Sequence, residues 1–330
     1  MTAPLIELRG VSKRFVKSLD LAERLAARLG VPVTEEAVHA VDLVDLAIGE
    51  GEVVGLVGES GCGKSTLGRM VAGIMEATEG TVSYRGTPVS ALPAAEAAAW
   101  RLKIQMVFQD PFASLNPRMR VREIIGQAPR VHGLIGREGL DDYVDKVMIN
   151  VGLDPAFKDR YPHQFSGGQR QRVGIARALA VNPEFLVCDE AIAALDVSIQ
   201  AQVINLFMKL RQELNLTYLF ISHDLGVVEH LSDRVCIMYL GRIVESAPTE
   251  QLFEAPSHPY TTALLEEVPR LDTQRRHYMP IKGEIPSPLA PPSGCHFHPR
   301  CPHATERCRN EKPLLREIAP GRYSACHLNG

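Results

Sequence analysis

The segment GLVGESGCGKST at residues 55–66 constrains the fold of this chain more than any other stretch. Within it, Gly58, Gly63, Lys64 and Ser65 match the spacing G-x-x-x-x-G-K-[ST] of a phosphate-binding loop. The glycines let the backbone curl so that its N–H groups point at phosphate oxygens, and the following helix adds its positive N-terminal dipole. An apolar, strand-sized run (GEVVGLV) precedes the loop and a helical run (STLGRMVAGIM) follows it. These flanks disfavour a glycine-rich turn without a ligand, so we expect an α/β fold that binds nucleotide phosphates here.

An Asp-Glu pair ends a second apolar run, EFLVCDE. Asp189 at the carboxyl end of a strand beside the phosphate loop is placed to hold Mg²⁺, together with the Ser65 hydroxyl. The adjacent Glu190 points elsewhere and is a candidate to orient and polarise an attacking water. A solvated turn is the alternative for such a pair, and the apolar run before it argues against that.

A third motif, FSGGQRQRVGIARALA at residues 165–180, places a small hydroxyl residue and two glycines before a helix. The backbone N–H groups at such a helix start form an anion site. A chain with one phosphate loop needs no second loop for the same nucleotide. We therefore expect this site to face the nucleotide of a partner subunit.

The order phosphate loop, SGGQ, strand–Asp–Glu, ALD resembles the motif set of ABC-type ATPase domains, and the resemblance spans residues 5–330. It implies that Gln109 in MVFQDPF is the Q-loop glutamine, and that His223 in LFISHD is the switch histidine. It implies a signature made of Ser166, Gly167, Gly168 and Gln169, and a D-loop at Asp196. The ATP contacts it implies are Phe15, which stacks on adenine, then Gly58, Glu59, Ser60, Gly61, Cys62, Gly63, Lys64, Ser65, Thr66 and Gln109.

The mechanism implied by this resemblance is a dimeric one. ATP lies between the phosphate loop of one subunit and the signature of the other. Lys64 stabilises charge on the phosphates, Glu190 orients the water, and His223 contacts the γ-phosphate. The Mg²⁺ ligands implied are Ser65, Gln109 and Asp189.

A narrower resemblance is carried by VGESGCGKST, FQDPFASLNPR, ALDVSIQAQ and APSHPYTTALL. These stretches are similar to the ATP-binding subunits of dipeptide and oligopeptide importers, a broad family in which some members serve nickel, oligosaccharides or other small solutes. One departure is the segment after the Asp-Glu pair, where the family usually has Pro-Thr-Ser and this chain has Ala-Ile-Ala at 191–193. Glu190 is retained, so only the rigidity of the turn is in question.

The resemblance also implies partners: a second ABC ATPase subunit, often a homologue, two transmembrane permease subunits and an extracytoplasmic solute-binding protein. Rival functions are the ATPase of a soluble metabolic complex, a ribosome or DNA-repair ABC ATPase, and a catalytically silent half of a heterodimer. The single cassette disfavours the translation type, and the absence of long inserts or coiled coils disfavours the repair type. The presence of Glu190 and His223 disfavours the silent half.

The expected organisation is an α/β P-loop ATPase domain over residues 1–268, with a helical subdomain at about 112–180. A proline-rich linker follows at 269–294, and a small cysteine-rich tail occupies 295–330. An insertion at residues 16–37 carries leucines on one helical stripe, read as a short packed helix rather than a docking helix. Those leucines are Leu21, Leu25 and Leu29.

Composition excludes several classes of protein. The formal net charge is −3 and the sequence pI is about 6.4, so no basic footprint for nucleic acid is present. The start MTAPLIELRG lacks a secretory pattern, and no apolar run approaches the roughly 18 residues of a membrane span. We expect a chain with reduced thiols at the cytoplasmic face of the membrane, without direct insertion.

The tail GCHFHPRCPHATERC holds Cys295, Cys301 and Cys308, and Cys326 follows near the end. Structural zinc sites commonly use C-x₂₋₄-C pairs, which these cysteines do not form, whereas four cysteines also hold iron–sulfur clusters. The resemblance implies a [4Fe–4S] cluster. Zinc, with nearby histidines as ligands, and metal-free thiols are the alternatives. We expect a structural role, since the linker should lead away from the ATP site.

Overall fold

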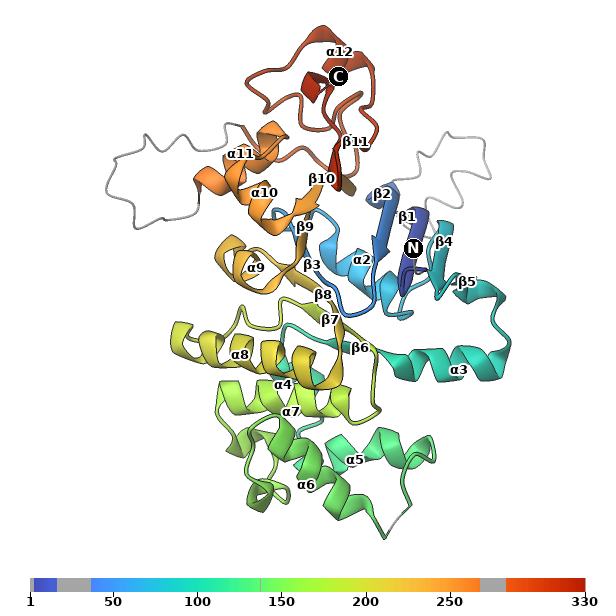
Figure 1. Ribbon diagram of the computed structural model, residues 1–330, viewed down its shortest axis with the longest axis vertical. Helices are drawn as coiled ribbons and strands as arrows, with labels where there is room; N and C mark the ends of the chain where they lie inside the picture. The colour runs from blue at the N-terminus through green and yellow to red at the C-terminus, as the bar shows by residue number, and fades with distance from the viewer. Residues whose placement is uncertain (1–2, 17–36, 137, 268–282, 330) are drawn as a thin grey trace, which may run out of the picture.

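The computed structural model describes residues 3–16, 37–136, 138–267 and 283–329. The expected leucine stripe of Leu21, Leu25 and Leu29 lies outside these residues. Two sheets and their covering helices form an elongated molecule, with the helices α5 (Val121–Val131) and α6 (Leu140–Asn150) at one end (Figure 1). The carboxyl-terminal segment with α12 (Glu306–Asn310) lies at the other end.

An eight-stranded sheet forms the centre of the molecule, in the order β11-β12-β10-β9-β3-β8-β7-β6. Its five strands from β9 to β6 are parallel, and β10, β11 and β12 add an antiparallel edge. The strand bounds are β3 (Val53–Val57), β6 (Ile104–Val107), β7 (Phe185–Asp189), β8 (Thr217–Ser222), β9 (Arg234–Tyr239), β10 (Arg242–Pro248), β11 (Arg316–Ala319) and β12 (Arg322–Ser324).

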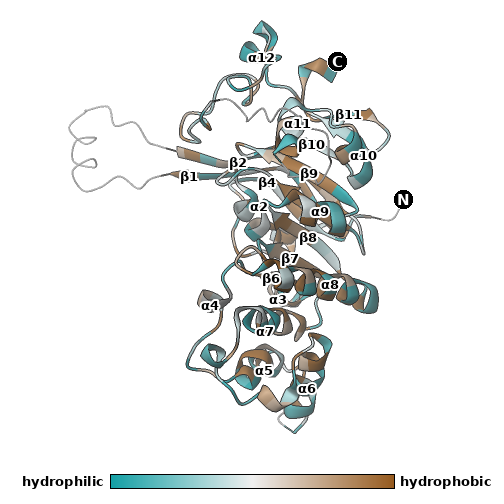
Figure 2. Cartoon of the chain, turned by 90° about the vertical axis from the view of Figure 1, so that its left-hand side faces the viewer, coloured by the Kyte–Doolittle hydropathy of each residue, from teal (hydrophilic) through white to brown (hydrophobic). Residues whose placement is uncertain are grey.

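The continuous apolar runs become central strands because both faces of this sheet are covered. All five residues of β3 and all five of β7 are buried. Alternate residues serve different cores: Val53 and Val57 pack with the helices on one face, and Val54 and Leu56 pack toward the second sheet. Figure 2 shows the central strands largely in the brown of apolar residues.

The second sheet is antiparallel and four-stranded, in the order β2-β1-β4-β5. Its strands are β1 (Ile6–Val16), β2 (Ala37–Ile48), β4 (Glu79–Tyr84) and β5 (Thr87–Pro88). The helix α2 (Lys64–Val71) packs between the two sheets through Leu67, Met70 and Val71. The phosphate loop is therefore attached at both ends to buried elements.

Helices cover the other face of the central sheet, and several of them form the lower part of Figure 1. Among them, α7 crosses below β6, and α5 and α6 pack beneath α7. The remaining helices are α3 (Ala94–Lys103), α4 (Pro111–Ser114), α7 (Gly167–Leu179), α8 (Val197–Leu214), α9 (Leu225–Leu231), α10 (Thr249–Glu254) and α11 (Pro259–Glu266).

The carboxyl-terminal segment 283–329 is packed on the ATPase core. Its β12 pairs with β10, with Glu245 opposite Ser324, so this segment extends the central sheet. Phe297 is buried in the helix-side core, and the His296 Nδ1 atom lies 3.2 Å from the carbonyl oxygen of Leu240. The expected linker, residues 269–294, lies in part (269–282) outside the described residues, and the segment that follows it packs beside the phosphate loop, where Arg300 contacts Glu59.

Candidate functional site

The phosphate loop connects β3 to α2, and its backbone path requires glycine at two positions. A Cβ atom on Gly58 would lie 2.1 Å from the carbonyl oxygen of Met238, and one on Gly63 would lie 2.0 Å from that of Ala40. Gly63 also has φ of 107°, which side-chain-bearing residues rarely adopt. The loop is thus packed against two neighbouring backbones, which holds its N–H groups in one arrangement.

Lys64 is the first residue of α2 and lies inside the loop, with 4% of its surface exposed. Its Nζ donates hydrogen bonds to the carbonyl oxygens of Gly58 at 2.7 Å and Glu59 at 3.0 Å. The ammonium group is therefore held at the centre of the loop, where bound phosphates would meet it. Cys62 is buried beside it, and burial raises the pKa of this thiol, which keeps it neutral.

Ser65 and Asp189 meet although they lie on different elements. The Ser65 hydroxyl donates to Oδ1 of Asp189 at 2.7 Å, from the first turn of α2 to the end of β7. Burial of Asp189 raises the pKa of its carboxyl, and the hydrogen bond from Ser65 opposes that shift. Hydroxyl and carboxylate oxygens are the donors that Mg²⁺ prefers. These two residues therefore fit a Mg²⁺ ion next to Lys64.

Glu190 lies at the junction of two polar side chains. Gln109, between β6 and α4, donates from Nε2 to Oε2 of Glu190 at 2.7 Å. The Nδ1 atom of His223, after β8, lies 3.6 Å from Oε1 of Glu190. The expected contact of Gln109 with Mg²⁺ would use its carbonyl oxygen Oε1, whereas this hydrogen bond uses Nε2. The structure thus brings two of the predicted residues, Gln109 and His223, to the carboxylate of a third, Glu190.

The backbone at Glu190 turns sharply, with φ of 47°, a conformation that non-glycine residues seldom adopt. The turn is held by the Glu190 N–H, which donates to the Ile221 carbonyl oxygen at 3.0 Å, and by the Ala193 N–H, which donates to the Glu190 carbonyl at 3.1 Å. Ala191 and Ile192 are buried. Where the resembled family has proline, apolar burial and hydrogen bonds hold this turn.

The signature motif starts helix α7. Ser166 is its N-cap residue: its hydroxyl accepts from the Gln169 N–H at 3.3 Å, and the Gln169 side chain accepts from the Ser166 N–H at 3.0 Å. Gly168 is required by packing, since a Cβ atom there would lie 2.4 Å from Cγ2 of Ile199 on α8. Gly167 lies between them. The reciprocal capping bonds present a rigid helix start.

The signature lies apart from the phosphate loop of the same chain. In Figure 1, α7 is on the far side of β6 and α4 from α2. Ser166 is exposed, and so is Asp196, which stands just before α8. An exposed anion site remote from its own loop has the geometry expected for a site that acts on another subunit.

Phe15 and three residues of the loop have surface positions. Phe15 is at the end of β1, where its side chain is 41% exposed and its ring centroid lies 5.5 Å from Nζ of Lys13. Ser60 and Gly61 at the tip of the loop are exposed, and Thr66 on α2 is half-buried. An exposed ring at a strand end is free to stack on a flat ligand.

Two residues near the loop were missed by the sequence reasoning. Arg300 of the carboxyl-terminal segment contacts both carboxylate oxygens of Glu59, at 2.7 and 2.9 Å. The Tyr260 hydroxyl oxygen accepts from the Glu59 N–H at 3.0 Å. No short motif joins positions this distant in the sequence, so only the fold reveals these contacts.

The prediction of a [4Fe–4S] cluster in the tail is wrong. Across residues 3–16, 37–136, 138–267 and 283–329, no three or more His, Cys, Asp or Glu side chains are grouped to hold a metal ion, which also removes the zinc alternative. The cysteines concerned are Cys295, Cys301, Cys308 and Cys326.

The physical reason lies in the other bonds of these side chains. The Cys308 thiol lies 3.3 Å from the Thr305 hydroxyl, and the Nδ1 atom of His298 lies 3.0 Å from the Cys295 carbonyl oxygen. Burial raises the pKa of the Cys295 thiol to about 11. None of the four cysteines forms a disulfide in the described part of the chain.

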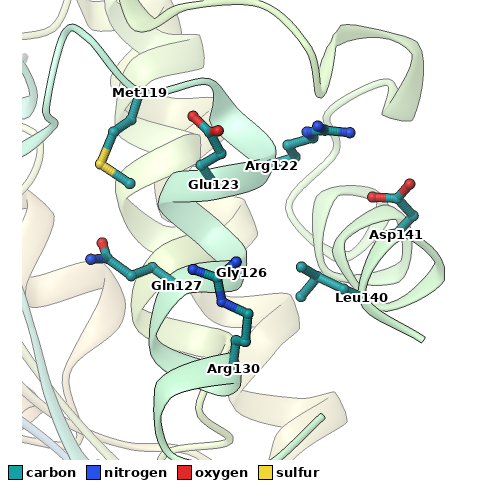
Figure 3. Close-up of a pocket in the computed structure, with 8 residues that line it drawn as sticks. All are labelled: Met119, Arg122, Glu123, Gly126, Gln127, Arg130, Leu140 and Asp141. Carbon is teal, nitrogen blue, oxygen red and sulfur yellow. The ribbon is translucent and has the colours of Figure 1, made fainter. Parts of the chain in front are cut away.

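A separate cavity of about 470 Å³ lies among the helices below the sheet. Its walls come from α5, the segment before it and the start of α6, with Arg122 on α5 and Asp141 on α6 (Figure 3). Its lining mixes acidic and basic groups. In the described part of the chain, no helix is long and apolar enough to cross a membrane.

Known proteins resemble this chain along most of its length. The ABC transporter family matches residues 41–193, and the oligopeptide/dipeptide transporter C-terminal region matches residues 244–308. A putative oligopeptide transport ATP-binding protein of Bacillus subtilis (strain 168), YkfD, is 54% identical over 89% of this chain and 91% of its own length. The oligopeptide transport ATP-binding protein AppF of the same strain is 48% identical over 98% of this chain and 97% of its own.

Solved structures show the same fold. The ATP-binding cassette MJ0796, in a dimeric post-hydrolysis state bound to ADP and Pi, superposes with a TM-score of 0.63 at 28% identity. The alignment covers 74% of this chain and 98% of that one. This structure confirms the α/β P-loop ATPase fold. The two family matches and the relatives that are 54% and 48% identical agree with it. The chain belongs to the ABC transporter family, among the ATP-binding subunits of the oligopeptide and dipeptide transporters.

Proposed function

We propose that this chain hydrolyses ATP to drive the import of dipeptides or oligopeptides. The observation that supports this most directly is the convergence of Lys64, the Ser65–Asp189 pair and Glu190 at the carboxyl edge of the central sheet. The transported class comes from the relatives, which are named for oligopeptide transport. The solute itself never touches an ATPase subunit, so its class rests on them.

ATP binding is assigned to the phosphate loop. Its backbone N–H groups, which the glycines leave accessible, donate hydrogen bonds to the phosphate oxygens, and Lys64 neutralises charge on the β- and γ-phosphates. The Ser65 hydroxyl and the Asp189 carboxylate would hold Mg²⁺, which would supply positive charge to the phosphate oxygens. Phe15 stacks on the adenine.

Hydrolysis is assigned to Glu190, whose carboxylate orients the attacking water and accepts its proton. His223, which lies beside the same carboxylate, contacts the γ-phosphate. Gln109 joins Glu190 to α4 and the helices below, because its own hydrogen bond spans from the β6 end to the carboxylate. A movement of those helices therefore changes the position of the catalytic base.

A second ATPase subunit completes the site. Ser166, Gly167, Gly168 and Gln169 contact the partner's nucleotide, and Asp196 lies at the same interface. The exposed, capped start of α7 supports this assignment, as does the dimeric state of the similar cassette MJ0796. Two permease subunits and an extracytoplasmic binding protein form the rest of the importer, which places this chain at the cytoplasmic face of the membrane.

Uptake of a labelled dipeptide and a labelled oligopeptide by cells that lack this chain tests the proposal. Wild-type chain supplied in trans should restore uptake, and Glu190→Gln should not. The Asp142→Asn variant, altered on the exposed face of α6, serves as a matched carboxylate control and should restore uptake fully. If the deletion leaves peptide uptake intact and abolishes uptake of nickel or an oligosaccharide, the peptide assignment is incorrect.

A further inference from the structure

The carboxyl-terminal segment contacts the phosphate loop through one arginine. Arg300 donates from Nη1 to Oε2 of Glu59 at 2.7 Å and from Nη2 to Oε1 at 2.9 Å. This is a two-pronged guanidinium–carboxylate pair, the strongest common geometry for such ions. It joins a residue of the tail to a residue in the middle of the nucleotide-binding loop.

The pair is largely shielded from water. The Arg300 side chain is 4% exposed and that of Glu59 is 20% exposed. A surface ion pair contributes little, but removing one member of a buried pair leaves an uncompensated charge. The contact therefore has enough energy to influence the shape of the loop.

An aromatic cluster fixes Arg300 in place. The ring of Phe297 packs against those of Tyr239 and Tyr260, each with centroids 5.3 Å away. The Arg300 guanidinium carbon lies 5.8 Å from the Tyr239 ring centroid, and the Arg300 N–H donates to the Phe297 carbonyl at 3.0 Å. Because Phe297 and Tyr260 are buried, the arginine has little freedom to leave its position.

Glu59 in turn restricts the position of Lys64. Its N–H donates to the Tyr260 hydroxyl at 3.0 Å, and its carbonyl oxygen accepts from Lys64 Nζ, also at 3.0 Å. One residue of the loop is thus held at its side chain by Arg300 and at its backbone by Tyr260. The same residue positions the ammonium group that faces the phosphates.

We propose that Arg300 is a positioning residue for ATP binding, and that the carboxyl-terminal segment thereby sets the nucleotide affinity of the cassette. It acts through Glu59, holding the loop backbone in the shape in which its N–H groups and Lys64 receive the phosphates. A loop that is already ordered loses less conformational freedom when the nucleotide binds. The inference rests on the phosphate loop binding ATP, and it is independent of which solute is transported.

The test is a double-mutant cycle on the full chain, made of Arg300→Ala, Glu59→Gln and the double variant. The dissociation constant of a fluorescent ATP analogue with Mg²⁺ is measured for each, together with KM and kcat for ATP in the assembled transporter. Each single variant should bind about tenfold more weakly, a loss of about 1.4 kcal/mol. The double variant should be no worse than either single one, because both remove the same contact. KM should rise with kcat nearly unchanged.

Three further variants separate the possible outcomes. Arg307→Ala removes an exposed arginine of α12 paired with Glu311 and should bind ATP as wild type does. Arg300→Lys keeps the charge but loses the fork, and should restore affinity only in part. Lys64→Ala tests the loop itself: retained binding there would contradict the proposed ATP site rather than the role of Arg300.

The inference is overturned if folded Arg300→Ala binds the nucleotide within twofold of wild type while Lys64→Ala does not bind it. Additive losses in the double variant would also overturn it, since independent effects do not require the pair. Should Arg300→Ala fail to fold, Glu59→Gln alone carries the test, because it keeps the shape of the side chain and removes its charge. Wild-type affinity in Glu59→Gln would then be decisive against the proposal.

Discussion

The Ser65 hydroxyl donates a 2.7 Å hydrogen bond to Oδ1 of Asp189, joining residues from different elements across the base of the phosphate loop. The pairing is possible because β7 lies next to β8, and β8 next to β3, so the carboxyl ends of these parallel strands meet at one edge. An oxygen pair at this place, beside Lys64, is where a metal ion neutralises phosphate charge.

Asp189→Asn should lower ATP turnover by at least ~10²-fold, because the charge that a bound metal ion supplies is worth several kcal/mol. The amide still accepts a hydrogen bond from Ser65, so the loop should keep its shape. Turnover is measured across a series of Mg²⁺ concentrations, with Asp142→Asn as control. A variant whose Mg²⁺ dependence matched wild type would remove Asp189 from the metal site.

Glu190→Gln should keep Mg-ATP binding and lower turnover by roughly 10²- to 10⁴-fold, the usual range for loss of a general base. Glutamine retains an oxygen that accepts from the Gln109 amide, so the local contact persists. Single-turnover hydrolysis at this chain's own site is the measurement. In a heterodimer the partner's glutamate is mutated in parallel, because its activity masks the loss. Near-normal hydrolysis would rule Glu190 out as the base.

Much of the central fold could be predicted because local chemistry determined it. The strands β3 and β7 were recognisable as unbroken apolar runs, and all their residues are indeed buried. The phosphate loop could be located because Gly58 and Gly63 are required where an added Cβ atom would lie 2.1 and 2.0 Å from a neighbouring carbonyl oxygen. At such positions the residue type and its spacing to neighbouring motif residues are enough to predict its structural role.

The rest depends on how distant segments pack. Gln109 was predicted near Mg²⁺, but whether its amide reaches the metal ligands or Glu190 depends on the path between β6 and α4. The Arg300–Glu59 pair joins segments 241 residues apart and has no motif. The resemblance implied a cluster at the tail cysteines, whereas residue spacing alone does not say what each thiol contacts, such as the Thr305 hydroxyl beside Cys308.

Ser166→Arg should leave nucleotide binding at this chain's own phosphate loop nearly intact and impair hydrolysis at the partner's site. The residue is exposed and caps a helix that lies away from α2, so a bulky cation there obstructs only an opposing subunit. Photolabelling with an ATP analogue reads binding on each subunit separately. Ser166→Thr, which keeps the capping hydroxyl, is the control. If labelling were lost mainly on the mutated chain and not on its partner, a site shared between subunits would be contradicted.

Acid should weaken the docking of the carboxyl-terminal segment through His258. This histidine is 1% exposed, its Nδ1 accepts from the Tyr260 N–H at 3.1 Å, and its ring packs near Phe297. Burial lowers the pKa of His258 to about 4, against about 6.5 for an unfolded chain. Between these values the unfolded state binds the extra proton, so the free energy of unfolding decreases as pH falls through this window.

The expected size of this effect is up to about 2 kcal/mol at pH 5, measured as the change in unfolding free energy or Tm from pH 7. Glu245 acts oppositely, because burial raises its pKa and it gains a proton in the folded state first. The readout is therefore the difference in slope between wild type and His258→Asn, which keeps a capping oxygen for α11 and cannot be protonated. The free energy of unfolding of His258→Asn should decrease less steeply as the pH falls. The control His303→Asn, altered at an exposed position, should have the same slope as wild type. Equal slopes for His258→Asn and wild type would show that His258 is not the group that titrates.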